Sequence, residues 1–117
     1  MLPFKNRLRK RNDFNRVYKR GRAVFSQNLT LRYIKNNFAQ TRIGILVNKS
    51  FSRKAVQRNK MKRIIREAVR EYLTSIEPNF DIVISCVPRE KIRGKTDFSE
   101  MKNQVKEILK KSNLLKQ

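Results

Sequence analysis

The sequence contains no histidine, no tryptophan and only one cysteine among its 117 residues. Histidine is the side chain that most often acts as a general base near neutral pH, so the usual acid–base group of a hydrolase is missing. The single thiol, Cys86, has no histidine to activate it and no second cysteine with which to form an internal disulfide. These absences count against catalysis by an imidazole or by a reactive thiol.

Acidic residues are also scarce, with nine Asp and Glu against thirty Lys and Arg, and the formal net charge is +21. The acids are scattered along the chain, so no carboxylate cluster suggests a two-metal nuclease site. Zinc-ligand spacing and a glycine-rich phosphate loop are absent as well. Glu67 and Glu71 come closest to a pair, and we interpret them as local partners of Arg63 and Arg70. If the protein takes part in catalysis, we expect the chemical step to belong to another molecule.

No apolar run approaches the roughly 20 residues that cross a membrane. The N-terminal region is basic without the apolar segment of a signal peptide, and a single cysteine fits a reducing compartment, so we expect a cytoplasmic protein. Hydrophobic residues make up 38% of the chain, which predicts one folded domain over residues 1–117. An excess of positive charge this large favours an anionic partner, and nucleic acid fits better than a membrane.

The chain does contain one long amphipathic segment, residues 53–76. At about 100° per residue, a helix over this segment carries apolar side chains on one arc and mainly basic ones on the next. The apolar arc consists of Met61, Ile64, Ile65, Ala68, Val69 and Tyr72. The basic arc consists of Arg58, Asn59, Lys62, Arg63, Arg66 and Arg70. Because the charges are segregated by sign rather than mixed at i, i+4 spacing, the pattern predicts a helix that presents one face to a polyanion.

A shorter helix is predicted at residues 13–20, with Asn12 as its N-cap and Gly21 directly after its end. Phe14 and Tyr18 fall on one face of this helix. Periodicity alone favours packing of both rings in the core, but an aromatic pair on a cationic helix also suits stacking on unpaired bases. Both interpretations stay open at this point.

Segments at 23–25, 29–34 and 42–48 alternate in hydrophobicity and predict strands. On the third of these, one face carries Ile43, Ile45 and Val47, and the opposite face carries Arg42, Gly44, Leu46 and Asn48. Because the connection between the two longer strands is short, we predict that they pair as an antiparallel hairpin.

Residues 80–87 are the most β-prone run and predict a buried strand. A last helix is expected after it, with its inward face formed by Phe98, Met101, Val105, Ile108 and Leu109. The predicted element order is therefore α-β-β-β-α-β-α, which places the chain among single-domain α+β proteins.

Both ends of the chain are basic. Residues 1–11 are interpreted either as a solvated terminus or as a basic arm that reaches along a phosphate backbone. Residues 110–117 are expected to form a basic tail that frays from the last helix.

Residues 58–67 closely resemble the RNR motif of the bacterial ribonuclease P protein subunit. Lys60 replaces the second arginine of that motif, which keeps the charge but loses the bidentate geometry. Further matches occur in the family's order, at Arg7 and Leu8, Asp13, Phe14, Val17 and Tyr18, Arg42, Ile43, Gly44, Ile45, Val47 and Lys49, and Arg53, Lys54, Ala55 and Val56. The resemblance covers about residues 7–88.

The resemblance implies an α+β sandwich similar to the second domain of ribosomal protein S5, with a left-handed βαβ crossover. Periodicity could not predict that hand, since such crossovers are nearly always right-handed. The implied activity is endonucleolytic removal of the 5′ leader from precursor tRNA. The protein would be the non-catalytic subunit, paired one to one with a catalytic RNA that binds most of the Mg²⁺, and no organic cofactor is implied.

The resemblance also implies two sets of contact residues and no catalytic residue in the protein. The catalytic RNA would contact Lys54, Arg58, Asn59, Lys60, Lys62, Arg63, Arg66 and Arg70. The single-stranded leader would lie in a cleft lined by Phe14, Tyr18, Arg32, Arg42, Gly44, Asn48 and Lys49. Arg32 stands where many members place an aromatic residue, although a guanidinium can also stack on a base. No metal ligand is assigned to the protein.

Other classes of protein share several of these features. A small basic ribosomal protein would also lack catalytic groups and would bind ribosomal RNA without any processing role. A nucleoid-type DNA-binding protein could place the same helix in a groove, but the sequence shows no helix-turn-helix partner or dimer seam. A protein-only nuclease is the enzyme alternative, and the missing histidine and carboxylate cluster count against it.

Overall fold

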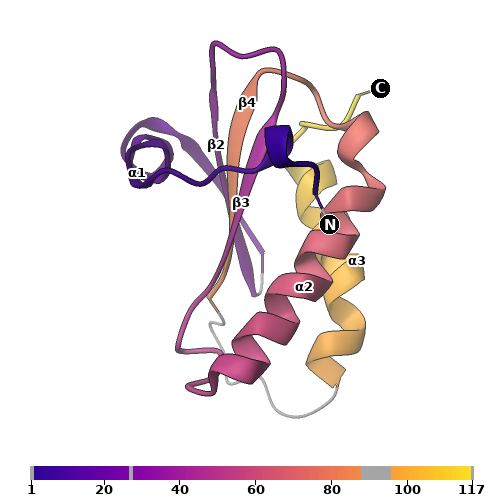
Figure 1. Ribbon diagram of the computed structural model, residues 1–117. Helices are drawn as coiled ribbons and strands as arrows, with labels where there is room; N and C mark the ends of the chain where they lie inside the picture. The colour runs from indigo at the N-terminus through magenta and orange to yellow at the C-terminus, as the bar shows by residue number, and fades with distance from the viewer. Residues whose placement is uncertain (1, 27, 88–95, 117) are drawn as a thin grey trace.

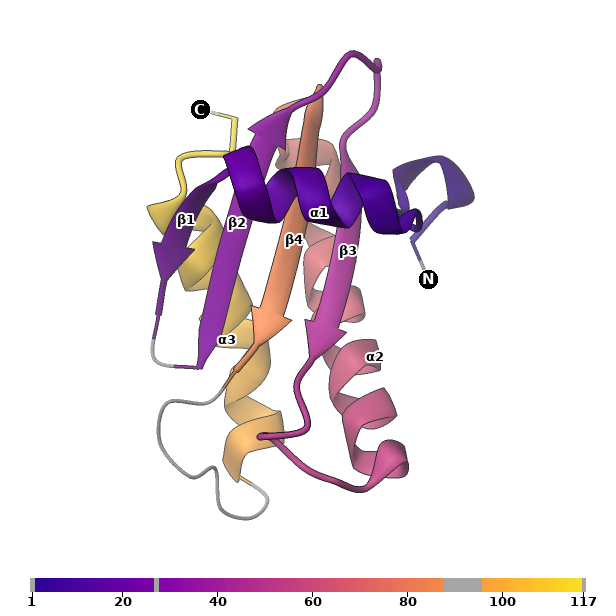
Figure 2. The ribbon, with the colours of Figure 1, turned by 90° about the vertical axis from the view of Figure 1, so that its left-hand side faces the viewer.

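A four-stranded sheet separates two long helices on one face from a short helix on the other (Figures 1 and 2). The computed structural model describes residues 2–26, 28–87 and 96–116. The elements in chain order are η1 (Phe4–Asn6), α1 (Arg11–Arg20), β1 (Arg22–Phe25), β2 (Leu29–Lys35), β3 (Arg42–Val47), α2 (Ala55–Glu71), η2 (Leu73–Ser75), β4 (Phe80–Cys86) and α3 (Thr96–Lys111). The predicted order of helices and strands is confirmed.

The strands lie in the order β1-β2-β4-β3, so the predicted hairpin between β2 and β3 is wrong. β4 runs between them, antiparallel to β2 and parallel to β3, with Ile84 opposite Leu31 on one side and Ile45 on the other. Every residue of β4 after Phe80 is buried. In this central position β4 pairs through both of its edges, and its Ile82, Ile84 and Cys86 side chains enter the main core.

The connection from β3 through α2 to β4 is left-handed. In Figure 2 both strands run downward, α2 returns behind the sheet, and β4 lies to the left of β3. When the view is turned so that the strands run upward with α2 in front, the chain still moves to the left. About 98% of such crossovers turn the other way, so the expectation drawn from the resemblance is confirmed.

The main core lies between the sheet and the two long helices. α2 contributes its buried residues Met61, Ile65, Ala68 and Val69, and α3 contributes Met101, Val105, Ile108 and Leu109. Ile43, Ile82 and Ile84 of the sheet pack against them. The predicted apolar faces of both helices are confirmed at these positions, and the side chain of Phe98 lies outside the described part of the chain. Each of the larger apolar side chains stabilises the fold by roughly 1.5–3 kcal/mol when fully buried.

A second, smaller core lies under α1 on the opposite face of the sheet. It consists of Leu8, Val17 and Val83, with Phe14 and Ile34 packed against it. α1 begins at Arg11 with Lys10 as its N-cap, so the prediction of Asn12 as the N-cap is wrong. The helix starts two residues earlier along the basic segment, without a side-chain cap.

Gly21 follows α1 as predicted, but for a different reason. Its φ of −77° is accessible to any residue, so no left-handed conformation is involved. A Cβ on Gly21 would instead lie 2.4 Å from the carbonyl oxygen of Val17 and 2.8 Å from that of Tyr33. The glycine is needed because the end of α1 and strand β2 approach its backbone closely.

Both ends of the described chain pack against the domain. Leu2 and Leu8 are buried, and Arg7 forms a parallel bridge to Ile43, so the first residues extend the edge of the sheet. At the other end Leu114 is buried and Leu115 pairs with Ile76, so the expected fraying beyond α3 is wrong. Apolar side chains anchor both segments, while their lysines stay at the surface.

Candidate nucleic-acid interface

The α2 stripe, defined as Arg58, Asn59, Lys62, Arg63, Arg66 and Arg70, lies on the outer side of α2. None of these residues is buried: Asn59, Arg63 and Arg70 are exposed, and the other three are half-buried. Lys54 and Lys60, also predicted to bind RNA, are exposed. The predicted separation of an apolar face from a cationic face is therefore confirmed, while RNA binding by these residues stays a prediction.

In the part of the chain that the structure describes, no acidic residue forms an ion pair with the α2 stripe. Within the described residues no ion pair involves Arg63 or Arg70, so the interpretation of Glu67 and Glu71 as their partners is wrong. Glu71 instead lies 3.8 Å from Lys102, across the contact between α2 and α3. The first turn of α2 contains no acid either, and the helix N-terminus adds its own partial positive charge.

On the other side of the sheet, Phe14 lies directly on Gly44. A Cβ built on Gly44 would come within 2.4 Å of Cζ of Phe14, so the ring occupies the space that any other residue would need. Phe14 is half-buried against the small core. Part of the ring therefore packs in the core, as periodicity favoured, while stacking of a base on Phe14 stays a prediction.

Tyr18 lies one turn further along α1 and is 41% exposed. Its hydroxyl group lies 2.9 Å from Oγ of Ser85, and the guanidinium carbon of Arg32 lies 5.1 Å from its ring centroid. The predicted pair Tyr18 and Arg32 is therefore brought together above β2 and β4. An exposed ring beside a guanidinium is a surface on which unpaired bases can stack.

Ser85, whose side chain is buried, is a contact of Tyr18 that sequence reasoning missed. It belongs to a run that the pattern identifies only as a buried strand, in which Ile84 and Cys86 face the main core. Strict alternation along the strand was the available signal, since it places Ser85 on the face opposite those two residues. The exposed side chains of Leu46 and Phe25 border the same face of the sheet.

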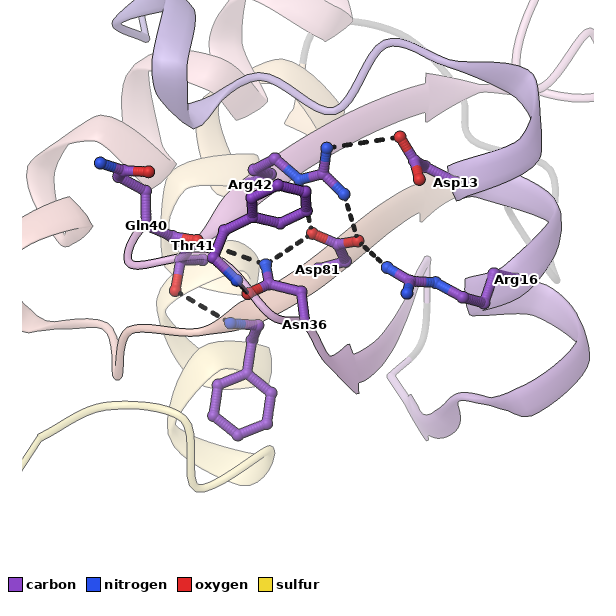
Figure 3. A network of polar contacts seen from close by, with 9 residues as sticks. Asp13, Arg16, Asn36, Gln40, Thr41, Arg42 and Asp81 are labelled. Carbon is purple, nitrogen blue, oxygen red and sulfur yellow. Dashed lines mark hydrogen bonds and ion pairs between the residues drawn. The ribbon is translucent and has the colours of Figure 1, made fainter.

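Arg42 lies on the predicted face but is engaged by acids. Figure 3 shows its guanidinium between Asp81 and Asp13. Its Nε and Nη2 atoms donate to the two oxygens of Asp81 at 2.9 and 2.7 Å, and Nη1 donates to Asp13 at 3.3 Å. The hydrogen bond to Asp81 is the main reason why the pKa of Arg42 is raised. Arg42 therefore joins β3 to β4 and α1, and its contact with a leader stays a prediction.

Asp81 is fully buried and is the centre of this network. Besides Arg42 it accepts hydrogen bonds from Asn36 Nδ2 at 2.8 Å and from Arg16 Nη2 at 2.5 Å (Figure 3). Burial alone would raise the pKa of Asp81, but the hydrogen bonds from Arg42, Asn36 and Arg16 outweigh it and lower the pKa. The charged carboxylate thus fixes α1 and the connection between β2 and β3 relative to the sheet.

Asn48 and Lys49 follow the end of β3 and are exposed. Oδ1 of Asn48 accepts a hydrogen bond from the backbone N–H of Ser50 at 2.8 Å, which stabilises the turn toward α2. Lys49 and Arg53 line a shallow cleft beside this turn. These residues lie between the open face of the sheet and the start of α2, rather than within the surface formed by Tyr18 and Arg32.

In residues 2–26, 28–87 and 96–116, no three His, Cys, Asp or Glu side chains are grouped as a metal site would require. No helix in these ranges combines the length and the apolar character needed to cross a membrane.

A family model described as Ribonuclease P matches residues 2–113. The chain belongs to the ribonuclease P protein family. A ribonuclease P protein component from a Pseudanabaena species is 36% identical over 116 residues, covering 98% of this chain and 97% of that protein. The component from Thermotoga maritima is 34% identical over 110 residues and covers 92% of each chain.

Solved structures of ribonuclease P proteins share the fold. The Staphylococcus aureus protein superposes with a TM-score of 0.83 at 29% identity, covering 94% of this chain and 97% of that one. The Thermotoga maritima protein gives 0.69 at 34% identity and covers 94% of each. The predicted family and α+β fold are confirmed, and with them a role as the protein subunit of a tRNA-processing ribonucleoprotein. The ribosomal-protein alternative is set aside.

Proposed function

We propose that this ribonuclease P protein holds the catalytic RNA and the 5′ leader of precursor tRNA against each other, while the RNA performs the phosphodiester hydrolysis. The observation that carries the proposal is the presence of two chemically different exposed surfaces on either side of β3. One is the cationic α2 stripe, and the other is the open sheet face with Tyr18, Arg32 and the edge of Phe14. The chain has no histidine that could act as a general base in the hydrolysis.

The α2 stripe suits the catalytic RNA because, among the described residues, its cations form no ion pair with an acid. A folded RNA presents closely spaced phosphates, and each phosphate that a cation neutralises releases counterions. The residues in this contact are Lys54, Arg58, Asn59, Lys60, Lys62, Arg63, Arg66 and Arg70. One protein per catalytic RNA, acting in the cytoplasm, is the arrangement that we propose.

The open sheet face suits the leader because a leader is single-stranded. Unpaired bases stack on aromatic rings and on guanidinium groups, and Tyr18 and Arg32 offer one of each. Phe14, Gly44, Asn48 and Lys49 would extend this path toward α2. Only the precursor has a leader, so this contact adds affinity for precursor over mature tRNA and orients the scissile phosphate.

In this proposal the catalytic RNA binds most of the Mg²⁺. A net charge of +21 would screen two polyanions from each other. The protein would then lower the Mg²⁺ concentration that the RNA needs to bind and cleave its substrate. No organic cofactor is required for this role.

The experiment adds the purified protein to the catalytic RNA and precursor tRNA at low Mg²⁺. We expect leader cleavage to be stimulated when the RNA is present and to be absent when it is omitted. Cleavage by the protein alone would overturn the assignment of the chemistry to the RNA. Failure to stimulate the RNA at any Mg²⁺ concentration would overturn the proposed function as a whole.

A further inference from the structure

A cleft of about 340 Å³ lies at the outer edge of β3, where the N-terminal segment passes between α1 and α2. Its walls include Arg7 and Arg9 from the N-terminal segment, Arg66 from α2, and the Phe14 ring over Gly44. Figure 1 shows this segment running beside α2. We call the cleft formed by these residues the arginine cleft.

Three arginines from two distant parts of the chain line the arginine cleft. No acidic side chain lines it, and among the described residues none of the three arginines forms an ion pair. Like charges that meet without an acid repel one another, which disfavours this arrangement in the free protein. A bound anion would remove that repulsion.

The N-terminal segment holds its two arginines in place. Nε of Arg7 donates to the carbonyl oxygen of Leu2 at 2.9 Å, and the guanidinium carbon of Arg9 lies 4.0 Å from the ring centroid of Phe4. The segment is itself anchored by the buried side chains of Leu2 and Leu8. Pre-positioned guanidinium groups lose less conformational freedom when they bind an anion than mobile ones do.

The composition of the walls suits a phosphodiester with its attached nucleoside. A guanidinium fork matches the spacing of two phosphate oxygens, and the Phe14 ring offers an apolar wall to a base or ribose. The volume lies at the lower end of the roughly 300–1,000 Å³ that is usual for small-ligand sites. One nucleotide of an RNA chain fits these features better than a compact inorganic anion does.

We propose that the arginine cleft binds one phosphodiester of RNA and so connects the α2 stripe to the open sheet face. Arg66 belongs to the first surface, and Phe14 with Gly44 belongs to the second, so the cleft lies on the path between them. The inference rests on the proposed function. The phosphate comes either from the leader or from the catalytic RNA, and the two sources are separated by experiment.

The test compares Arg9→Gln with Lys106→Gln, which removes the same charge from an exposed position on α3. Each variant is assembled with the catalytic RNA, and its affinities for that RNA, for precursor tRNA and for mature tRNA are measured. Thermal unfolding of each free variant checks that the fold is intact. A third variant, Lys10→Gln, removes a neighbouring exposed charge that does not line the cleft.

If the phosphate belongs to the leader, Arg9→Gln lowers the preference for precursor over mature tRNA by about tenfold, the loss expected for one charge-assisted hydrogen bond to a phosphate. If it belongs to the catalytic RNA, the affinity for that RNA falls by a similar factor and the preference is unchanged. In both cases Lys106→Gln and Lys10→Gln change either quantity less than twofold, and Arg9→Lys restores part of the loss.

Two results would overturn the inference. Equal effects of Arg9→Gln and Lys106→Gln would mean that only net charge matters. Equal effects of Arg9→Gln and Lys10→Gln would assign the binding to the basic segment as a whole and not to the cleft. In either case the proposed function stands as long as the unaltered protein stimulates the RNA, so the two failures are distinguishable.

Discussion

Nη2 of Arg16 lies 2.5 Å from Oδ2 of Asp81, which connects an outer helix to a fully buried carboxylate on the central strand. The two residues are 65 positions apart in the sequence. α1 itself buries only Val17 completely, so apolar packing under this helix is limited. We conclude that the Asp81 network decides where α1 lies over the sheet, and therefore how Phe14 and Tyr18 are presented.

Replacing Asp81 by asparagine should strongly destabilise the fold. The substitution keeps the shape of the side chain but leaves Arg42 and Arg16 beside a buried neutral group. We expect the free energy of unfolding, measured by urea denaturation, to fall by about 3–5 kcal/mol. Asp13→Asn is the control, because Asp13 makes one longer ion pair at 22% side-chain exposure and should cost at most about 1 kcal/mol. Similar losses for both variants would contradict the central role of Asp81.

The stability of the protein at acidic pH should depend on the ionisation of Asp81. Its pKa in the folded protein is lowered from the ordinary value of 3.8, so this group stabilises the fold above about pH 4. The contribution is lost as the pH falls through the lowered pKa. Urea denaturation between pH 2 and pH 7 should therefore show a steeper acid loss for the wild-type protein than for Asp81→Asn. If the free energy of unfolding falls equally steeply with decreasing pH in both proteins, Asp81 does not cause the loss of stability in acid.

Gly44→Ala should displace the Phe14 ring, because the new methyl group would lie 2.4 Å from its Cζ. Overpacking of this kind costs about 1–3 kcal/mol of folding free energy. The clash involves two residues, so it should be relieved in a Phe14→Leu background. A double-mutant cycle measures this coupling by urea denaturation. If the two losses simply add, the ring and the glycine are not in the contact described.

Arg63→Gln should weaken binding of the catalytic RNA in a salt-dependent way. Arg63 is exposed on the α2 stripe and has no acidic partner among the described residues, so its charge is available to a phosphate. Loss of one phosphate contact should reduce the slope of log affinity against log salt by roughly 0.7–0.9. Filter binding at several salt concentrations, from roughly 50 to 200 mM, measures this slope. Lys106→Gln on α3 should leave the slope unchanged.

Tyr18→Ala should reduce the preference for precursor over mature tRNA, because it removes an exposed ring on which a base can stack. Stacking of this kind is worth about 1–3 kcal/mol per base, so the preference should fall at least fivefold or so. Tyr18→Phe keeps the ring and loses only the hydroxyl contact with Ser85, and most of the preference should remain. Binding of the catalytic RNA alone serves as the control and should be the same for both variants. Equal losses for the two would assign the effect to the hydroxyl group.

Local periodicity was sufficient to assign the two faces of α2. Side-chain direction repeats with the pitch of a helix, so Met61 and Ile65 point inward and Arg63 and Arg70 point outward whatever the rest of the fold does. The same argument identified the two faces of β3 and the inward residues of α3. These assignments depend only on neighbours along the chain.

Strand pairing and the hand of the crossover depended on the tertiary structure. The connection between β2 and β3 is short enough for a hairpin, yet β4 enters from beyond α2 and separates the two strands. In that position β4 pairs through both of its edges and directs Ile82, Ile84 and Cys86 into the main core. The hydrophobic pattern within a strand does not predict which strand will pair with it.

The roles of individual arginines were also decided in three dimensions. In the sequence Arg42 and Arg66 look alike, since each lies on the polar face of its own element. In the structure Arg42 is held by Asp13 and Asp81, which are 29 and 39 positions away, while Arg66 lines one cleft with Arg7 and Arg9 and forms no ion pair among the described residues. Charges act through distance in space rather than along the chain, so only the folded structure distinguishes the arginine that holds the domain together from one that can bind RNA.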